Sequence, residues 1–307
     1  MAIPTNTYLT TADVARREDL SDIVYKISPT ATPVLTRSAV GKATNTLHQW
    51  TVQELAGVVV NRQIEGDDAA GIAVTPVSKL TNQTQISTKT VIVSGSEQAA
   101  NTAGIKNMMG FQLSLKSAEL KRDMESDLCA SDVLATAPRQ SRGLRGWLVD
   151  NVNRNGGTIA NYTSNTGYTV LGTLRPFTES QVKDVLQQQY AAGGEPDTIM
   201  LPPALKQTFS GFTGNSTRID KGEDGKVFAA TDFYVSDFGT IEAVPNRFMP
   251  TRDVYLLQSD KLAVCYYRSF MTKDLAPTGD AEKKEIIVEW TLEARAPKAH
   301  GAIYDVQ

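Results

Sequence analysis

Histidine is the usual general base of enzymes, and this chain of 307 residues contains only two, His48 and His300. His48 lies in a β-patterned segment beside Trp50, which favours a half-buried structural role. His300 precedes Gly301 near the end of the chain, where a cap or an interface contact is expected. The sequence has no H-E-x-x-H, Walker-loop, G-x-G-x-x-G or G-x-S-x-G motif. Acid–base catalysis therefore has few candidate residues.

Ser94 could be taken for a nucleophile, but its neighbours explain it more simply. Ser94 and Glu97 have the spacing of a capping box, in which the serine hydroxyl accepts a hydrogen bond from the amide three residues on and the glutamate reaches back to the cap. No matched base follows nearby in the sequence. We therefore expect a helix to begin here.

Acidic residues cluster at Glu65, Asp67 and Asp68, close to Arg62. Carboxylates can bind a hard cation such as calcium, but a calcium loop presents its oxygens at alternating positions, and these residues are nearly consecutive. The cluster is more typical of a solvated loop tip that pairs with basic residues of a neighbour. No metal ion or other cofactor is predicted.

The composition is that of an ordinary globular protein, with 41% hydrophobic and 21% charged residues. Cys129 and Cys265 lie far apart in different kinds of element, so we expect two buried, reduced thiols. The net charge of −3 is spread along the chain and gives no basic surface for binding DNA phosphates. No apolar run has the length of a membrane span, and the first residues lack a secretory signal pattern. The chain is expected to stay in the cytoplasm where it is made.

The segment from residue 47 to residue 130 has the most informative organisation. Residues 47–55 and 84–93 are rich in β-branched and aromatic side chains and predict two strands. Residues 56–83 between them contain several glycines and predict a protruding loop. Residues 97–130 predict one helix, about 50 Å long. Such an arm cannot bury its own faces within one domain, so it must lie on a neighbour, as in a shell-forming structural subunit.

The rest of the chain predicts further helices and strands. A helix over residues 177–190 starts at Thr178, and a buried strand at 198–201 precedes a helix at 203–209. More strands are expected at 228–244, 254–258 and 262–267. Residues 262–275 and 285–295 predict a long antiparallel hairpin. Apolar and polar residues alternate in its second strand, so one face is expected in the core and the other mostly in water.

Several short segments keep a characteristic order and spacing over nearly the whole chain. The most specific is the closing stretch, from residues 275–281 (LAPTGDA) through 299–301 (AHG). The others are residues 19–30 (DLSDIVYKISPT), 48–50 (HQW), 85–87 (QIS) with 93–95 (VSG), 119–125 (ELKRDME), 143–147 (GLRGW), 236–239 (SDFG) and 246–248 (NRF). Together they resemble the major capsid proteins of tailed bacteriophages, which have the Hong Kong 97 type fold. Where that family commonly has a lysine before Thr-Gly-Asp, this chain has Pro277.

The resemblance implies an α+β chain with the Hong Kong 97 type capsid fold. In that fold an N-terminal arm and an extended β-hairpin loop reach over adjacent subunits, and a spine helix belongs to a peripheral domain. An axial domain packs around the five-fold and six-fold positions. The implied parts of this chain are the N-terminal arm at 1–45, the extended loop at 46–93, the peripheral domain at 94–174 and 262–295 with its spine helix at 97–130, the axial domain at 175–261 and a C-terminal tail at 296–307.

The predicted protruding loop and the resemblance together indicate candidate inter-subunit contact residues. They are the loop residues Arg62, Glu65, Asp67 and Asp68 and the turn residues Thr278, Gly279 and Asp280. The resemblance implies no catalytic residue. Lys79 and Lys89 could serve the lysine-to-asparagine cross-link of some relatives only in a generic sense.

The implied function is that of a major capsid protein that self-assembles into the icosahedral head shell of a tailed double-stranded DNA bacteriophage. The implied partners are copies of the chain in pentamers and hexamers, together with scaffolding, portal and decoration proteins. The shell would enclose DNA without sequence-specific binding and would form in the cytoplasm of the host bacterium. The amino-terminal arm is too short to include a large scaffolding segment, so a separate scaffolding protein, or none, is expected.

Two alternatives stay open from the sequence alone. An encapsulin-like nanocompartment would share the fold and enclose an enzyme, with a cargo gene as its neighbour in place of terminase and portal genes. A soluble hydrolase would belong to another class, and substitution of His48 or His300 would then abolish its activity. In a shell protein the same substitutions would alter only folding or assembly.

Overall fold

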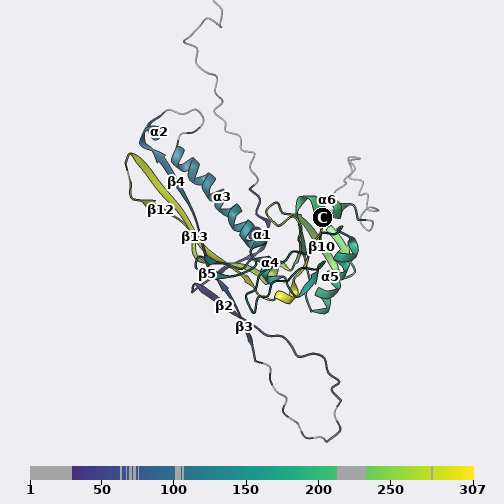
Figure 1. Ribbon diagram of the computed structural model, residues 1–307. Helices are drawn as coiled ribbons and strands as arrows, with labels where there is room; N and C mark the ends of the chain where they lie inside the picture. Colours follow the sequence, from purple (N-terminus) through teal and green to yellow (C-terminus); the bar gives the residue numbers. More distant parts are fainter. Residues whose placement is uncertain are drawn as a thin grey trace, which may run out of the picture.

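The computed structural model describes residues 30–62, 64–66, 68, 71, 74, 76–100, 105, 107–212, 233–277 and 279–307. Most of the predicted N-terminal arm, and the candidate residues Asp67 and Thr278, lie outside these residues. Figure 1 shows an elongated molecule, in which a long β-hairpin with a helix along it extends from a compact body. The chain between β2 and β3 leads away from that body in a different direction.

A four-stranded sheet forms the elongated part. Its order is β1 (Ala39–Lys42), β12 (Leu262–Leu275), β13 (Ala281–Ala294) and β4 (Gln85–Ser94). Strands β12 and β13 form the long antiparallel hairpin that the sequence predicted, and β4 pairs antiparallel with β13. Helix α3 (Met108–Ala130) packs along β4, where Met109 lies against Val91 and Val93. The hairpin is therefore covered by a helix for much of its length (Figure 1).

The second face of β13 is buried, although the sequence predicted that it meets water. Residues 286–292 are all buried, Glu289 included. The polar groups of this strand are paired inside the protein, because Thr84 donates a hydrogen bond to Glu289 at 2.9 Å and Asn82 donates to the carbonyl of Leu292 at 2.7 Å. Alternation identifies the two faces of a strand but does not tell whether another element covers the polar one.

The helix predicted over residues 97–130 is divided. A short helix, α2 (Gly95–Ala99), begins at Ser94, whose hydroxyl accepts a hydrogen bond from the amide of Glu97 at 3.3 Å, as the capping-box spacing predicted. Helix α3 starts only after Asn107, which is its N-cap. The sequence between the two helices contains weak helix formers, namely Asn101, Thr102 and Gly104.

The predicted protruding loop is bounded by a hairpin that the sequence predicted only in part. Strand β2 (Leu47–Val52) matches the first predicted strand, but its antiparallel partner is β3 (Ser78–Gln83). The second predicted strand is β4, which joins β13 instead. The sequence of β3, SKLTNQ, lacks a regular apolar and polar alternation, so no strand was expected there. Residues 53–77, here called the β2–β3 loop, thus extend from a two-stranded root.

A six-stranded sheet forms the compact body. Its order is β7 (Asn151–Asn153), β14 (Gly301–Ile303), β11 (Val254–Leu257), β8 (Thr198–Leu201), β10 (Gly239–Pro245) and β9 (Phe233–Ser236). Helices α5 (Glu179–Ala191) and α6 (Pro203–Ser210) lie where the sequence predicted them, and Gln181 accepts a hydrogen bond from the amide of Thr178 at the start of α5. Within the stretch 296–307, which the sequence analysis assigned to a C-terminal tail, β14 is buried between β7 and β11. Three apolar residues are too few to show a strand period.

The six-stranded sheet has a hydrophobic core on each face. Met200, Tyr255 and Ala302 belong to a first core, which they form with α3 and α4 (Leu144–Trp147). Their chain neighbours Ile199, Leu256 and Ile303 belong to a second core, which includes side chains of α5 and α6. Successive side chains of a strand point to opposite faces, so the same short strands contribute to both cores.

Short elements complete the described structure. They are α1 (Pro33–Arg37), β5 (Ala135–Thr136), β6 (Arg139–Gln140), η2 (Ser259–Lys261) and η3 (Pro297–Ala299). The strand predicted at 228–244 is divided into β9 and β10 by a turn, and residues 228–232 lie outside the described residues. None of the helices in the described part of the chain is long and apolar enough to cross a membrane.

Candidate inter-subunit surfaces

The β2–β3 loop exposes large apolar side chains. Each of the following is at least 57% exposed: Leu55, Val58, Val59, Val60, Ile64, Val74 and Val77. The described residues of this loop form no helix or strand of their own. Exposed apolar patches of this kind typically mark surfaces that contact another chain.

The charged residues predicted as contacts lie on the same loop. Arg62, Glu65 and Asp68 are exposed among the apolar side chains, and Asp67 lies outside the described residues. At the root of the loop, Lys298 forms an ion pair with Glu54 at 2.8 Å. The root is thus attached to the body, and the charged residues are presented farther along the loop.

The turn between β12 and β13 carries the other candidate residues. Gly279 has φ +76°, a backbone conformation that favours glycine, and the carbonyl of Asp280 accepts a hydrogen bond from the amide of Gly95 at 3.1 Å. Both turn residues are exposed, and Thr278 is outside the described residues. In Figure 1 this turn and the β2–β3 loop lie at different ends of the molecule. One chain therefore does not bring the two groups of candidates together.

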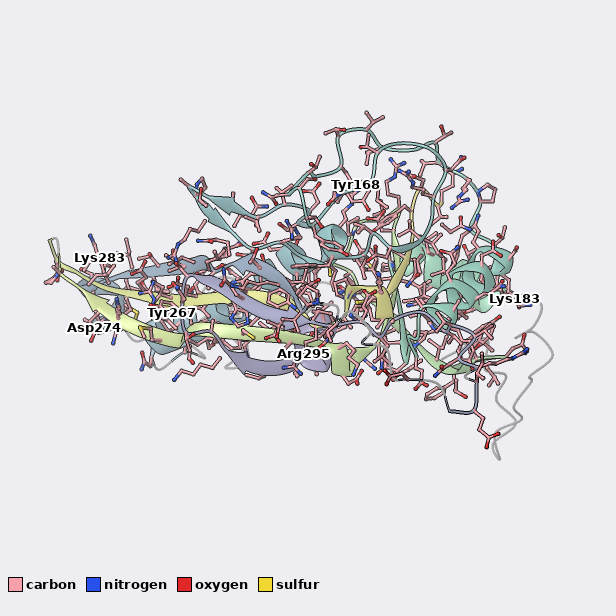
Figure 2. All side chains as sticks on the ribbon, turned by 90° about the horizontal axis from the view of Figure 1, so that it is seen from below. Tyr168, Lys183, Tyr267, Asp274, Lys283 and Arg295 are labelled. Carbon is pink, nitrogen blue, oxygen red and sulfur yellow. The ribbon has the colours of Figure 1, made fainter. Side chains whose placement is uncertain are left out.

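The outer half of β12 is a surface that the sequence analysis missed. Beyond Tyr266, β12 has no second neighbour among the described strands, because β1 pairs only with residues 263–266. Its exposed apolar side chains are Tyr267, Phe270, Met271 and Leu275. Figure 2 shows Tyr267, Asp274 and Lys283 on this arm, with Lys183 at the opposite end of the molecule. An exposed sheet edge can pair with a strand of another chain.

A groove of about 1140 Å³ lies beside the root of the β2–β3 loop. Its lining comes from β2 and β3, from Tyr162 and Thr163, from the C-terminal end of α5 and from η3. Apolar side chains on its wall include Val52, Leu55 and Leu80. The groove offers a further concave surface next to the loop.

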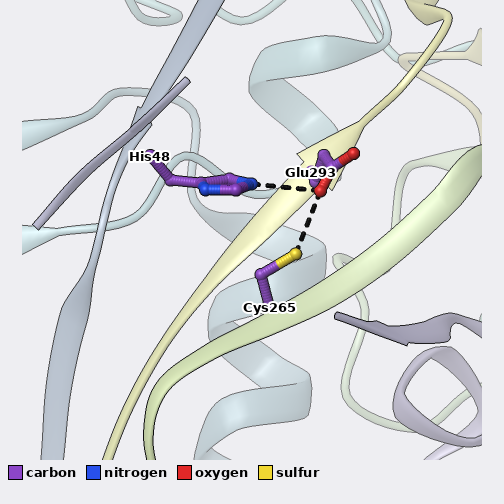
Figure 3. A group of neighbouring side chains, drawn as sticks. All are labelled: His48, Cys265 and Glu293. Carbon is purple, nitrogen blue, oxygen red and sulfur yellow. Dashed lines mark hydrogen bonds and ion pairs between the residues drawn. The ribbon is translucent and has the colours of Figure 1, made fainter. Parts of the chain in front are cut away.

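Three side chains from three strands meet at the root of the loop. Figure 3 shows His48 of β2 and Cys265 of β12 pointing to the carboxylate of Glu293 on β13. The Nε2 atom of His48 and the thiol of Cys265 each lie 3.0 Å from Oε2 of Glu293. His48 is half-buried and Cys265 is a buried free thiol, as the sequence predicted for each residue separately.

The pKa values of this group follow from its burial and its contacts. The hydrogen bond from His48 has the largest effect and lowers the pKa of Glu293 to about 2, although burial opposes this shift. Burial raises the pKa of Cys265 to about 12, and the neighbouring Glu293 adds to the shift. Glu293 is thus a carboxylate at neutral pH, and Cys265 is a thiol that donates to it.

The second histidine is a buried structural residue. His300 caps η3 and is 1% exposed, and its Nδ1 atom accepts a hydrogen bond from the amide of Gln258 at 3.2 Å. Burial lowers the pKa of His300 to about 4, so the ring is neutral at pH 7. Of the two roles expected for His300, the structure confirms the cap.

A buried carboxylate on helix α3 binds the backbone of helix α1, and the sequence analysis did not predict this contact. Glu125 of α3 accepts hydrogen bonds from the amides of Val34 and Leu35, at 2.8 and 3.0 Å, and from the side chain of Asn246 at 2.7 Å. Burial raises its pKa, and the hydrogen bonds oppose the rise. The only sequence signal was an acid on a predicted helix, which is usually solvated.

Comparison with known proteins identifies the family of this chain. Residues 3–307 match the model of a family described as SU10 major capsid protein. The chain belongs to this family. It is 27% identical over 324 residues to the major capsid protein of Escherichia phage Phieco32, and the match covers 91% of each protein.

Solved structures with the same fold include phage capsids and an encapsulin. A chain of the Cyanophage A-1(L) capsid asymmetric unit has a TM-score of 0.68 at 16% identity, with 97% of this chain and 98% of that chain covered. A chain of the holo-SrpI encapsulin complex from Synechococcus elongatus has a TM-score of 0.56 at 11% identity, with 93% and 92% covered. These likenesses confirm the predicted Hong Kong 97 type fold.

This capsid protein therefore forms the icosahedral shell of a bacteriophage head, and its place is in the virion. The predicted resemblance to phage major capsid proteins is confirmed. The encapsulin shares the fold alone, so the family match favours the phage shell over the nanocompartment alternative. The family is one of structural proteins.

Proposed function

We propose that the shell closes because the β2–β3 loop of each subunit lies on the surface of a neighbour. The observation that supports this role most directly is the run of exposed apolar side chains from Leu55 to Val77. Covering apolar surface stabilises a contact by roughly 25 cal/mol per Å². Each such contact is modest, but a closed shell repeats it over every copy of the chain.

In the same proposal the charged candidates select the partner surface. Arg62, Glu65 and Asp68, with Asp67, would face complementary charges on the neighbour and fix the orientation of the loop. Thr278, Gly279 and Asp280 would contribute a second contact at the far end of the β12–β13 hairpin. Both groups are contact residues, and neither has a catalytic role in this proposal.

The subunit divides into the parts that the Hong Kong 97 type fold implies. The arm comprises residues 1–45, the extended loop 46–93, the peripheral domain 94–174 with 262–295, and the axial domain 175–261. Helix α3 takes the place of the longer spine helix expected from the sequence. The pairing of β14 with β11 supports adding residues 296–307 to the axial domain.

We further propose that the copies form pentamers and hexamers and enclose a double-stranded DNA genome without reading its sequence. A net charge of −3 supports this, since a protein that grips phosphates needs an excess of basic residues. Scaffolding, portal and decoration proteins are the additional partners of such a shell. No chemical reaction is assigned, because His300 is buried as a cap and His48 is bound to Glu293.

Shortening the loop tests the proposal. Replacing residues 56–76 by a short Gly-Ser linker keeps both β2 and β3, whereas a deletion of residues 58–80 would also remove half of β3. We expect a folded, soluble subunit with an unchanged far-ultraviolet circular dichroism spectrum that no longer closes shells. Negative-stain electron microscopy and sedimentation would measure shell formation. Normal shells from the shortened chain would contradict the role given to the loop.

A smaller change separates the apolar surface from the length of the loop. Substituting Val58, Val59 and Val60 together by serine is expected to reduce the yield of shells at least about tenfold. Serine side chains gain much less free energy than valine side chains when a neighbour covers them. The matched control is Val170→Ser, at an exposed valine outside the loop. We expect that control to assemble normally, and equal loss in both variants would contradict a specific role for the loop.

A further inference from the structure

Three metal-binding side chains converge at the root of the β2–β3 loop. They are His48 on β2, Cys265 on β12 and Glu293 on β13, and their ligand atoms all lie within 4.8 Å of one another. Figure 3 shows the imidazole and the thiol directed at one carboxylate. The three residue types together are ligands that zinc accepts.

We propose that His48 Nε2, Cys265 Sγ and Glu293 Oε2 bind a zinc-type divalent cation. A thiolate ligand favours zinc over magnesium or calcium, which prefer oxygen atoms. Ligand atoms of a tetrahedral zinc ion stand about 3.3–3.6 Å apart, given bonds of about 2.0–2.3 Å. The two contacts to Glu293 are 3.0 Å each, and all three ligand atoms lie within 4.8 Å of one another, so shifts of about 1 Å would bring them to these separations. A water molecule would complete the coordination from the partly exposed side of His48.

The register of the strands holds two of the ligands on one face of the sheet. Ala263 pairs with Glu293, and Cys265 pairs with Thr291, so Cys265 and Glu293 are diagonal neighbours across β12 and β13. Diagonal side chains on one face are close enough to interact. The site therefore does not depend on a flexible segment for these two ligands.

A glycine on the neighbouring strand keeps space for the sulfur atom. Gly41 of β1 is the register partner of Cys265, and a Cβ atom at Gly41 would overlap with the Cys265 sulfur. Any larger residue there would force the sulfur atom to shift from this position. The packing of β1 against β12 thus leaves room for the Cys265 sulfur at the position that the proposed site requires.

The second oxygen of Glu293 already has a partner. Arg295 donates a hydrogen bond from Nε to Oε1 at 3.1 Å, which orients the carboxylate and leaves Oε2 directed at His48 and Cys265. Outer contacts of this kind commonly orient metal ligands. On binding, the thiol proton passes to solvent, and the thiolate and carboxylate charges together balance the dication.

Bound metal would join β2 to the four-stranded sheet and so fix the root of the loop. The site lies within one chain, so the inference does not depend on the assembly role proposed for the loop. Without metal, the same geometry is a histidine–glutamate contact with a thiol hydrogen bond. The two cases differ in whether the thiol proton can be displaced by a cation.

Cobalt(II) is the probe that distinguishes the two cases, because a thiolate-bound cobalt ion has a near-ultraviolet charge-transfer band. Reduced, metal-stripped wild-type protein, as subunits and as shells, is titrated with cobalt(II) and then with zinc(II). We expect one ion per chain, with the band appearing on cobalt addition and disappearing when zinc replaces it. A wild-type chain that shows no band would overturn the proposal without any variant having to fold.

Variants then identify the ligands. Cys265→Ser, His48→Gln and Glu293→Gln are each expected to weaken cobalt binding about 100-fold or more, in keeping with the loss of a direct ligand. Gly41→Ala should weaken it at least about tenfold by displacing the sulfur. Cys129→Ala changes the other cysteine, which lies beside Asn246, and should leave the band unchanged. A band that persists in Cys265→Ser, or that Cys129→Ala abolishes, would contradict the assignment.

Discussion

Buried charged side chains of this protein are paired with side chains that lie far away in the sequence. Glu289 forms ion pairs with Arg139 at 2.5 Å and with Arg268 at 2.8 Å, and it accepts a hydrogen bond from Thr84. Its side chain is only 2% exposed. A buried carboxylate is tolerated only when several groups compensate for its lost hydration. This explains how an acid can stand in the most buried strand of the sheet.

Replacing Glu289 by glutamine is expected to destabilise the subunit in a pH-dependent way. Burial acts to raise the pKa of Glu289, but the hydrogen bonds from Arg268 and Thr84 and the charge of Arg139 outweigh it and lower the pKa. Such a group stabilises the fold above its unfolded pKa of about 4.3 and loses that effect as the pH falls through its folded pKa. The variant should lose about 2–4 kcal/mol at pH 7 and less below about pH 4.

Urea unfolding of dissociated subunits across this pH range measures the difference. The matched control is Glu119→Gln, which removes a partly exposed pair with Lys116 on α3 and should cost less than about 1 kcal/mol. If Glu289→Gln costs the same at pH 7 and at pH 3.5, the ionised carboxylate is not what stabilises the fold.

Whole elements were predictable where their signals are local. Helix α5 has its cap at Thr178 and a glycine at positive φ, Gly193, just after its end, and β8 is a short apolar run followed by the prolines that begin α6. The β12–β13 hairpin has two long strands around one turn. Each of these features can be recognised from residues that are neighbours in the sequence.

Elements defined by partners far along the chain were not predictable. Strand β3 has no apolar alternation and exists because β2 pairs with it, and β14 is a strand because β7 and β11 lie on both sides of it. The candidate site shows the same limit. His48 and Cys265 were assessed separately, and the distance between the two cysteines in the sequence indicated only buried, reduced thiols. Their meeting with Glu293 depends on strand registers that one sequence does not reveal.

Trp50 connects the β2–β3 hairpin to the rest of the subunit, and its removal should loosen that element selectively. Its indole donates a hydrogen bond to the carbonyl of Ala294 at 3.0 Å, and its ring centre lies 5.3 Å from that of Trp147. Because Trp50 is only partly buried, Trp50→Ala should cost about 2 kcal/mol, less than the 3–5 kcal/mol typical of a fully buried aromatic residue. Hydrogen exchange should accelerate in β2 and β3.

The control for this prediction keeps the aromatic ring. Trp50→Phe removes only the hydrogen-bond donor and should cost about 1 kcal/mol. Exchange in α5, which belongs to the second core, should accelerate less than exchange in β2 and β3 in both variants. Uniform acceleration over the whole chain would show instead that Trp50 stabilises the fold globally.

At the scale of the whole molecule, two long extensions are attached to one compact body. The β2–β3 loop and the β12–β13 hairpin leave the body in different directions (Figure 1). The body itself is a sheet with a core on each face, built from strands that alternate between the two. A subunit of this design can present several contact surfaces around one packed body, and a closed shell repeats each of those contacts over its copies.

The shared sheet also predicts that the two cores unfold together. All three tryptophans, Trp50, Trp147 and Trp290, belong to or pack on the first core, whereas Leu186 of α5 is buried in the second. Leu186→Ala should cost about 2–5 kcal/mol and should lower the urea midpoint of dissociated subunits by the same amount in tryptophan fluorescence and in far-ultraviolet circular dichroism. Leu171→Ala, at an exposed leucine, should shift neither by more than about 0.5 kcal/mol. If the fluorescence midpoint stayed at its wild-type value while circular dichroism showed an earlier phase, the sheet would not couple its two faces.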